Sequence, residues 1–340
     1  MSSKDQVLSV RDLHVEFSGR AGTVGRRSAV RAVDGVSFDV ARGEILALVG
    51  ESGCGKTTIA QSVMRLVKPT SGQIISEGRD LARLHSRELR RARQRFQMIF
   101  QDPFGSLDPR QTVFRTVEEP LIIHRAARSA PDRRDRVLKA LDFAHLRPPE
   151  RLAARYPHEL SGGQRQRVAI ASAIVLQPAL VVADEPVSML DVSARAGILR
   201  LMLDLRDRLG ISYLFITHDL SVAWILADRI AVAYLGRIVE IGPATELVSA
   251  PSHPYTQALL AASRESGSTD GRGSGVLSGE TPSASAVPSG CRFHPRCPLY
   301  RALGEPAQCR TADPTLRSVA DPARSPGAHQ SACHFAQENS

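Results

Sequence analysis

The sequence predicts an α/β protein whose core is a parallel sheet covered by helices. Short apolar runs at residues 44–50, 178–186 and 212–219 have the length and composition of buried strands. A helix-patterned segment at residues 194–210 separates the last two runs, and strands that alternate with helices form parallel sheets. The first run ends directly in a glycine-rich loop that opens a helix.

Two segments before this core predict an N-terminal antiparallel β subdomain. Residues 7–17 and 33–40 alternate apolar and polar side chains, which is the pattern of strands with one buried face. After the glycine-rich loop, residues 57–67 have the spacing of a helix. Residues 229–242 add a pair of strands that closes the core.

The chain is predicted to divide into a main domain and extensions. We expect the domain at residues 5–250, with a helical insert at about 103–157 in which apolar side chains recur every three or four residues. A helix at 251–263 is followed by a flexible linker at 264–289, rich in glycine, serine and proline. Residues 290–340 form an extension that holds four of the five cysteines.

The composition predicts a cytoplasmic protein. No apolar run approaches the roughly 20 residues that span a bilayer, and the first residues lack the blocks of a secretion signal. The net charge of +9 is concentrated in an arginine-rich segment at residues 83–96. We interpret this segment as a solvated helix face and expect no nucleic-acid partner, because no aromatic side chains are interleaved with the arginines.

The pattern G-x-x-x-x-G-K-T at residues 50–57 predicts a phosphate-binding loop, since a strand precedes it and a helix follows it. Its glycines let backbone N–H groups approach phosphate oxygens, and the start of the helix adds positive potential. We expect Lys56 to neutralise the β- and γ-phosphates of ATP and the Thr57 hydroxyl to bind Mg²⁺. The expected ATP-binding residues of the loop are Gly50, Ser52, Gly53, Cys54, Gly55, Lys56, Thr57 and Thr58.

Two acidic residues follow the apolar strand that starts at residue 180. Asp184 suits the ligand shell of Mg²⁺, and Glu185 is placed to orient or deprotonate an attacking water. The alternative is that the two carboxylates only form a solvated end of the strand. A strand as apolar as this one rarely ends in two carboxylates without a counter-charge, and Mg²⁺ and Lys56 would supply that charge.

Three further side chains are candidates for the same chemistry. His218 follows the strand at 212–217 and could hold the γ-phosphate, although a single histidine is more often structural. Gln101, just before the helical insert, could bind Mg²⁺ or sense the γ-phosphate and pass that state to the insert. Phe17 could stack on adenine or belong to the core.

Together with LSGGQRQR at residues 160–167, these motifs resemble, in order, those of the ATP-binding subunits of ABC transporters. The resemblance covers residues 5–250 and implies a P-loop NTPase core of the ABC ATPase type, which hydrolyses ATP to ADP and phosphate. It identifies the Walker A loop at 50–58, the Q-loop at Gln101, the Walker B residues Asp184 and Glu185, the D-loop at Asp191 and the switch histidine at His218.

The same resemblance implies that half of each ATP site comes from a second ATPase subunit. In this family two such subunits pack head to tail, and the signature motif touches the γ-phosphate of ATP held by the partner. The signature residues in this chain are Ser161, Gly162, Gly163 and Gln164. ATP binding then closes the dimer, and hydrolysis reopens it.

Segments 99–110, 234–242, 253–260 and 290–298 are similar to the peptide-importer ATPases of bacteria, closer to the second of their paired ATPases. This implies uptake of di- and oligopeptides by a peripheral subunit at the cytoplasmic face of the membrane. The implied partners are a second ATPase, commonly a paralogue, two transmembrane permeases and an extracytoplasmic binding protein. Nickel or oligosaccharides are alternative cargoes, and a soluble ABC-class ATPase that acts on nucleic acid or ribosomes is a distant alternative.

The C-terminal cysteines Cys291, Cys297, Cys309 and Cys333 are separated by 5, 11 and 23 residues. A cytoplasmic location argues against disulfides, and the lack of close pairs argues against zinc. Thiolate ligation of a [4Fe–4S] cluster tolerates irregular spacing, and some relatives of this tail are thought to bind one. We favour such a cluster over zinc or unliganded thiols, with His294 and His334 as substitute ligands.

Overall fold

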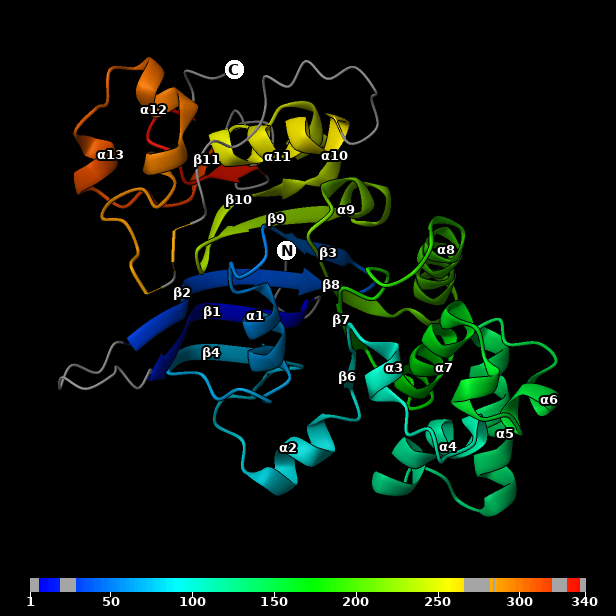
Figure 1. Ribbon diagram of the computed structural model, residues 1–340. Helices are drawn as coiled ribbons and strands as arrows, with labels where there is room; N and C mark the ends of the chain where they lie inside the picture. Colours follow the sequence, from blue (N-terminus) through cyan, green and yellow to red (C-terminus); the bar gives the residue numbers. More distant parts are fainter. Residues whose placement is uncertain (1–5, 19–28, 266–281, 284, 320–328, 337–340) are drawn as a thin grey trace, which may run out of the picture. The chain divides into compact units, whose positions relative to one another are not determined.

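The computed structural model describes residues 6–18, 29–265, 282–283, 285–319 and 329–336 (Figure 1). The chain forms two compact units. The first contains the described residues of Met1–Leu8, Asp39–Ile45 and Ile75–Ile216. The second contains those of Ser9–Phe38, Leu46–Ile74 and Thr217–Ser340.

The first unit is built on three parallel strands in the order β8-β7-β6. They are β6 (Phe96–Ile99), β7 (Leu180–Asp184) and β8 (Ser212–Thr217). Every residue of β7 and β8 is buried, which explains why their sequences are apolar runs without alternation. Helix α8 (Val192–Leu209) connects β7 to β8 and buries a stripe of apolar side chains, so the predicted alternation of strand and helix is confirmed.

Short helices follow β6 in the first unit. They are α3 (Pro103–Ser106), α4 (Val113–Ile123), α5 (Ala130–Phe143), α6 (Pro149–Ala153), the 3₁₀ turn η2 (Pro157–Glu159) and α7 (Gly162–Ile174). Helices α4, α5 and α7 pack against one another (Figure 1). The hydroxyls of Thr112 and Ser129 accept hydrogen bonds from backbone N–H groups in the first turns of α4 and α5. These N–H groups have no partner within the helix itself.

The arginine-rich segment forms α2 (Ser86–Ala92), and none of its residues is buried. The interpretation of this segment as a solvated helix face is therefore confirmed. Strand β6 begins at Phe96, directly after the arginines, and was not predicted, because a strand of four residues, three of them apolar, has no periodic pattern that distinguishes it within a charged segment.

The second unit contains most of the N-terminal sheet and five further paired strands. The N-terminal strands β1 (Gln6–Ser18), β2 (Ala29–Ala41) and β4 (Ser71–Ser76) lie in the order β2-β1-β4. Within the first unit, β5 (Arg79–Asp80) pairs antiparallel with Ile75 and Ser76 at the end of β4. The five further strands, in the order β11-β12-β10-β9-β3, are β3 (Ile45–Val49), β9 (Arg229–Tyr234), β10 (Arg237–Pro243), β11 (Arg317–Ser318) and β12 (Gln330–Ser331). Strand β3 pairs parallel with β9, and the remaining pairs are antiparallel.

Helices complete the second unit. They are α1 (Lys56–Val63), α9 (Leu220–Leu226), α10 (Ala244–Ser249), α11 (Pro254–Glu265), the turn η3 (His294–Arg296), α12 (Pro298–Ala302) and α13 (Gln308–Thr311). The expected division of the chain at residues 250, 263 and 289 stays a prediction, and most of the expected linker lies outside the described residues.

A fully buried carboxylate joins three segments of the second unit. Glu240 on β10 is 0% exposed and accepts the backbone N–H groups of Ser252 and His253 at 2.7 and 3.0 Å. The His329 ring lies 2.8 Å from the same carboxylate. A buried charge needs such partners, so Glu240 fixes the entry to α11 and the segment that leads into β12.

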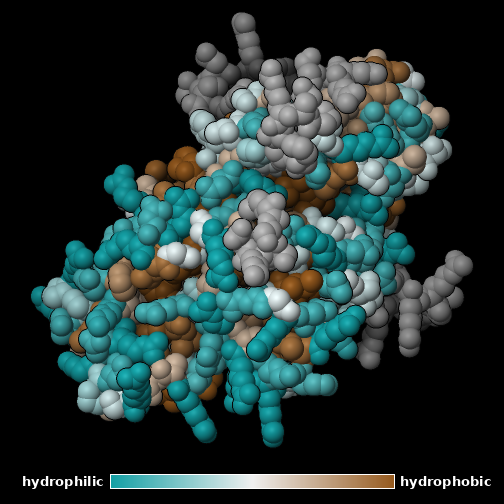
Figure 2. All heavy atoms as spheres, turned by 180° about the vertical axis from the view of Figure 1, so that it is seen from behind, coloured by the Kyte–Doolittle hydropathy of each residue, from teal (hydrophilic) through white to brown (hydrophobic). Residues whose placement is uncertain are grey.

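The visible surface is mainly hydrophilic. In Figure 2 hydrophilic residues cover most of one face, and hydrophobic residues show between them. Within the described part of the chain, no helix is long and apolar enough to cross a membrane.

The buried imidazole of His253 predicts an acid-sensitive second unit. Burial lowers the pKa of His253 from 6.5 to about 4, although Glu240 and a hydrogen bond with the Ala332 backbone oppose the shift. As the pH falls below 6.5, the unfolded chain binds a proton here and the folded chain does not, so the free energy of unfolding falls until about pH 4. Between pH 7 and pH 5 this side chain should remove about 2 kcal/mol of stability.

Urea unfolding at the two pH values, followed by the fluorescence of the single tryptophan, Trp224 in α9, measures this effect in the same unit. His253→Asn removes the titration and keeps an acceptor for the Tyr255 N–H, which His253 Nδ1 accepts at 3.1 Å. That variant should lose about 2 kcal/mol less than the wild type, whereas His158→Gln, at an exposed position, should match the wild type. An equal loss in His253→Asn and the wild type would contradict the assignment.

Candidate functional site

The phosphate loop connects β3 to α1 in the second unit, as its sequence predicts. Two of its glycines are required by close approach of the backbone. A Cβ at Gly50 would lie 2.2 Å from the Ala233 carbonyl oxygen, and one at Gly55 would lie 2.3 Å from the Ala32 carbonyl oxygen. Gly55 also has φ of 102°, which L side chains rarely adopt, and it begins α1.

Lys56 is buried within the loop. Its Nζ donates to the carbonyl oxygens of Gly50 and Glu51 at 2.7 and 2.9 Å. Ser52, Gly53 and Thr57 are exposed, so the loop presents these residues to solvent. The loop thus places an ammonium group beneath exposed backbone, which suits a phosphate ligand.

Cys54 in the same loop is 1% exposed. Burial raises the pKa of its thiol, and the thiolate is the reactive form of cysteine. Burial therefore disfavours the reactive thiolate, and the Cys54 Sγ fills space 2.8 Å from where a Cβ of Gly50 would lie.

Glu51, which the sequence motif does not single out, links the loop to two residues far away in the chain. Its backbone N–H donates to the Tyr255 hydroxyl at 2.9 Å. Its carboxylate accepts two hydrogen bonds from Arg296, at 2.9 and 3.1 Å. Arg296 lies within the segment GCRFHPRCP, but no sequence spacing indicates a partner 245 residues away.

The two candidate carboxylates, Asp184 and Glu185, belong to the first unit. Asp184 is buried at the end of β7, and Glu185 follows with φ of 45°, an uncommon conformation for a residue with a side chain. The Glu185 N–H donates to the Ile216 carbonyl at 3.0 Å, and its own carbonyl accepts from the Ser188 hydroxyl at 3.0 Å. These bonds hold a strained backbone, and strain of this kind clusters at functional sites.

The structure brings two of the expected catalytic residues together. Gln101 Nε2 donates to Glu185 Oε2 at 3.2 Å. Gln101 is exposed and directly precedes the helices of the first unit. The contact gives those helices a physical link to the carboxylate.

The signature motif begins α7 with a capping box. The Ser161 hydroxyl accepts the Gln164 N–H at 3.3 Å, and Gln164 Oε1 accepts the Ser161 N–H at 3.1 Å. This leaves Gly162 and Gly163 in the first turn of a helix of 13 residues, where backbone N–H groups and positive potential favour an anion.

Asp191 likewise begins α8. It accepts hydrogen bonds from the Ala194 N–H at 2.8 Å and from the Ser193 hydroxyl at 2.7 Å, and these bonds lower the pKa of its carboxyl group.

His218 and Phe17 are both exposed and belong to the second unit. Phe17 is 45% exposed, which excludes the alternative that it belongs to the core.

The four C-terminal cysteines lie within electrostatic range of one another. Burial raises the pKa of the Cys291 thiol to about 12, and charge on Cys333, Cys297 and Cys309 adds to the shift. The pKa of Cys333 rises to about 11 for similar reasons. Nevertheless, no group of three or more His, Cys, Asp or Glu side chains among the described residues is arranged to hold a metal ion, so the expected [4Fe–4S] cluster is not shown by the structure.

The two histidines considered as substitute ligands have other partners. His294 Nδ1 lies 2.9 Å from the Cys291 carbonyl oxygen, and His334 Nε2 lies 3.0 Å from the Ala312 carbonyl oxygen. Each ring thus commits one nitrogen to the backbone.

Two regions of the chain match known families. Residues 33–188 match the family described as "ABC transporter", and residues 239–302 match the "Oligopeptide/dipeptide transporter, C-terminal region". The chain is 48% identical over 313 residues to a protein of Brucella ovis named "Putative peptide import ATP-binding protein", covering 92% of this chain and 94% of that protein.

Two further relatives are similar along most of their length. The oligopeptide transport ATP-binding protein AppF of Bacillus subtilis is 43% identical over 339 residues, covering 98% of each chain. The dipeptide transport ATP-binding protein DppF of Escherichia coli is 45% identical over 291 residues, covering 86% of each chain.

Solved structures agree on the fold. A dimeric ATP-binding cassette in a post-hydrolysis state, bound to ADP and Pi, aligns with a TM-score of 0.61 at 31% identity, covering 70% of this chain and 98% of that one. The protein cbiO1 of Clostridium perfringens, part of an ABC transporter complex, aligns with a TM-score of 0.64 at 28% identity, covering 72% and 91%. The predicted fold class is confirmed, and the chain belongs to the ATPase subunits of ABC transporters, in the group that carries the oligopeptide/dipeptide transporter C-terminal region.

Proposed function

We propose that this chain is the ATP-hydrolysing subunit of an importer that carries di- and oligopeptides across the cytoplasmic membrane. The observation that carries the proposal is the presence of an ABC transporter region and an oligopeptide/dipeptide transporter C-terminal region in one chain. Relatives that align over most of their length are named as peptide, oligopeptide and dipeptide transport proteins.

We propose that it works at the cytoplasmic face as a peripheral subunit. Its partners would be a second ATPase, a paralogue, together with two transmembrane permeases and an extracytoplasmic binding protein. The ATPase does not itself need to contact the cargo, because fold and ATP chemistry are shared across many transport functions.

The loop side chains suit Mg²⁺ and ATP. We propose that Thr57, Gln101 and Asp184 would supply the oxygen donors that Mg²⁺ prefers, and the bound ion would neutralise charge on the phosphates. Lys56 would exchange its carbonyl partners for phosphate oxygens, keeping its buried charge paired. His218 would hold the γ-phosphate, and Phe17 would stack on adenine.

Glu185 would orient or deprotonate the attacking water. The hydrogen bond from Gln101 holds one of its carboxylate oxygens at 3.2 Å, which fixes the direction of the group. The left-handed backbone at Glu185 sets the starting point of the side chain. Both features favour a fixed carboxylate over a solvated strand end.

The signature glycines support a site completed by a partner. A Cβ at Gly162 would lie 3.7 Å from the Leu190 side chain, and one at Gly163 would lie 3.4 Å from that of Ala194, which are ordinary van der Waals distances. Glycine weakens a helix by roughly 0.5–1 kcal/mol relative to alanine. Packing among the described residues does not require these glycines, so we propose that the approach of the partner's ATP does.

Replacing Glu185 tests the assigned chemistry. Glu185→Gln keeps the shape of the side chain but removes its basicity, so turnover should fall by at least about 100-fold while ATP still binds. The trapped ATP should hold the ATPase dimer closed, which size-exclusion chromatography with Mg²⁺ and ATP measures. Glu246→Gln, an exposed change on α10, should behave as the wild type, and near-normal turnover by Glu185→Gln would refute the role of this carboxylate.

Uptake by whole cells tests the cargo. Cells that lack the gene should lose uptake of a radiolabelled tripeptide, regain it with the wild-type chain, and fail to regain it with Lys56→Ala, because the buried ammonium of the phosphate loop is gone. Loss of nickel or oligosaccharide uptake with normal peptide uptake would contradict the proposal.

We also propose that the four cysteine thiols ligate a [4Fe–4S] cluster. Their mutual effect on pKa supports a common location. The arrangement does not fit a single ion, but a cluster of four irons is larger and spaces its thiolates further apart than one ion does. Burial keeps the free thiols protonated, and bound iron would stabilise the thiolate form that ligates it.

Anaerobic purification tests the cluster. The wild-type chain should be brown with broad visible absorbance, and Cys297→Ser should lose the colour and the bound iron. Cys54→Ser removes the fifth cysteine, which lies in the phosphate loop, and should keep the wild-type spectrum. A colourless wild-type protein without iron would overturn the cluster.

A further inference from the structure

The C-terminal extension reaches the phosphate loop through a bidentate ion pair. The two terminal nitrogens of Arg296 donate to the two carboxylate oxygens of Glu51, at 2.9 and 3.1 Å. The Arg296 side chain is 7% exposed and that of Glu51 22%. A two-point pair that is largely shielded from water is stronger and more directional than a surface salt bridge.

The pair acts on a residue whose backbone is already held at two points. The Glu51 N–H donates to the Tyr255 hydroxyl, and the Glu51 carbonyl accepts from Lys56 Nζ, each at 2.9 Å. A rotation of Glu51 would therefore move the carbonyl that Lys56 contacts. The shape of the loop around Lys56 depends on what holds the Glu51 side chain.

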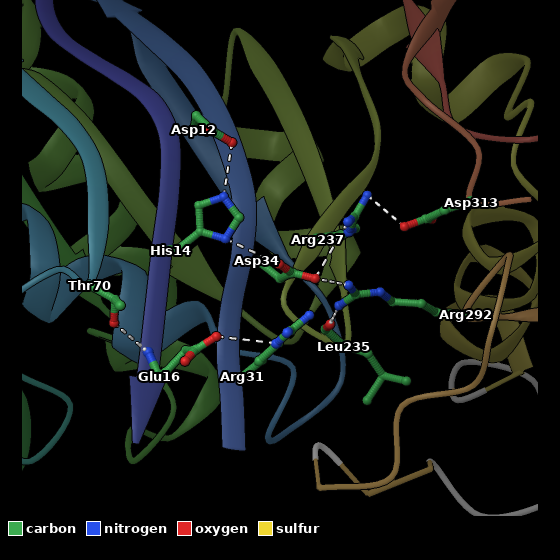
Figure 3. A network of polar contacts seen from close by, with 10 residues as sticks. All are labelled: Asp12, His14, Glu16, Arg31, Asp34, Thr70, Leu235, Arg237, Arg292 and Asp313. Atoms are coloured by element: carbon green, nitrogen blue, oxygen red, sulfur yellow. Dashed lines mark hydrogen bonds and ion pairs between the residues drawn. The ribbon is translucent and has the colours of Figure 1, made fainter. Parts of the chain in front are cut away.

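Arg292, in the same short segment as Arg296, makes a second connection to the phosphate loop. Figure 3 shows Arg292 between the carboxylate of Asp34 and the Leu235 carbonyl oxygen, with Arg237 linking Asp34 to Asp313. Gly236, which follows Leu235 in the chain, donates its N–H to the Cys54 carbonyl of the phosphate loop at 2.8 Å. Two arginines of one short segment thus support the loop, Arg296 directly and Arg292 through the turn at Gly236.

Arg296 is itself held in a defined place. It ends the turn η3, where its N–H donates to the Phe293 carbonyl at 3.0 Å. The Phe293 ring packs against the rings of Tyr234 and Tyr255, with centroids 5.3 Å apart in each case. The following residue, Cys297, accepts the Tyr300 N–H at the start of α12. The guanidinium is therefore presented from a packed turn and not from a free side chain.

We propose that Arg296 is a positioning residue of the ATP site: through Glu51, the C-terminal extension holds the phosphate loop in the shape that receives ATP. The inference rests on the ATP-binding role proposed above for this loop. A loop that is held before binding loses less conformational freedom when ATP arrives, so the pair should lower the dissociation constant for ATP.

Neutral variants of both partners separate positioning from simple charge. Arg296→Gln and Glu51→Gln keep polar side chains of similar length. If charge near the phosphates were the only effect, loss of the Glu51 carboxylate would remove a repulsion and tighten ATP binding. A positioning role predicts that ATP binds more weakly to both variants, because either change releases the same loop.

The test measures binding of a fluorescent N-methylanthraniloyl ATP with Mg²⁺ to the full chain. Arg296→Gln and Glu51→Gln should each weaken binding about tenfold, and the double variant should be no weaker than the singles, because all three remove one interaction. Arg310→Gln, an exposed change on α13 of the same extension, should bind as the wild type. In turnover assays the loss should raise the KM for ATP while kcat changes by less than about twofold.

The outcomes separate this inference from the proposed function. A wild-type chain that does not bind the analogue would overturn the ATP-binding function, and this inference with it. If the wild type binds, and Glu51→Gln binds equally or more tightly, only the positioning role is overturned. Glu51→Gln also decides the question if Arg296→Gln fails to melt cooperatively, since Glu51 lies outside the extension.

Discussion

The buried carboxylate of Glu240 is the interaction on which the C-terminal third of the chain depends. It is 0% exposed and accepts two backbone N–H groups at the entry to α11, with the His329 ring against the same group. A carboxyl group buried in this position is tolerable only while its hydrogen-bond partners stay in place. Glu240 therefore couples β10, α11 and β12, and through Tyr255 of α11 the same arrangement reaches the N–H of Glu51.

This coupling gives a physical meaning to the C-terminal family region. The match at residues 239–302 starts beside Glu240 and includes Tyr255, Arg292 and Arg296. Each of these residues contacts the phosphate loop or a segment that contacts it. The part of the chain that distinguishes this group of ABC ATPases thus serves as a support for the phosphate loop within the second unit.

Backbone conformation, as well as side-chain identity, shapes the candidate functional residues. Gly50 and Gly55 admit carbonyl oxygens where any Cβ would collide, and Glu185 accepts a left-handed conformation in order to direct its carboxylate toward Gln101. Ser161 and Gln164 cap each other so that the first turn of α7 keeps its N–H groups available. The left-handed backbone at Glu185 reduces local stability and the capping box at Ser161 increases it, and both lie where phosphate chemistry is expected.

The sequence by itself determined the fold class and the family, because buried parallel strands, glycine-rich turns and ordered motifs are local patterns within short stretches of chain. It also indicated the residues of the phosphate loop and the carboxylates, whose roles remain predictions. The sequence did not indicate Glu51 as a point of control, the partner of Arg296, or the pairing of β12 with β10. Those features join residues far apart in the chain, and only the tertiary structure decides them, since burial and the pairing of distant charges have no periodicity that a sequence could display.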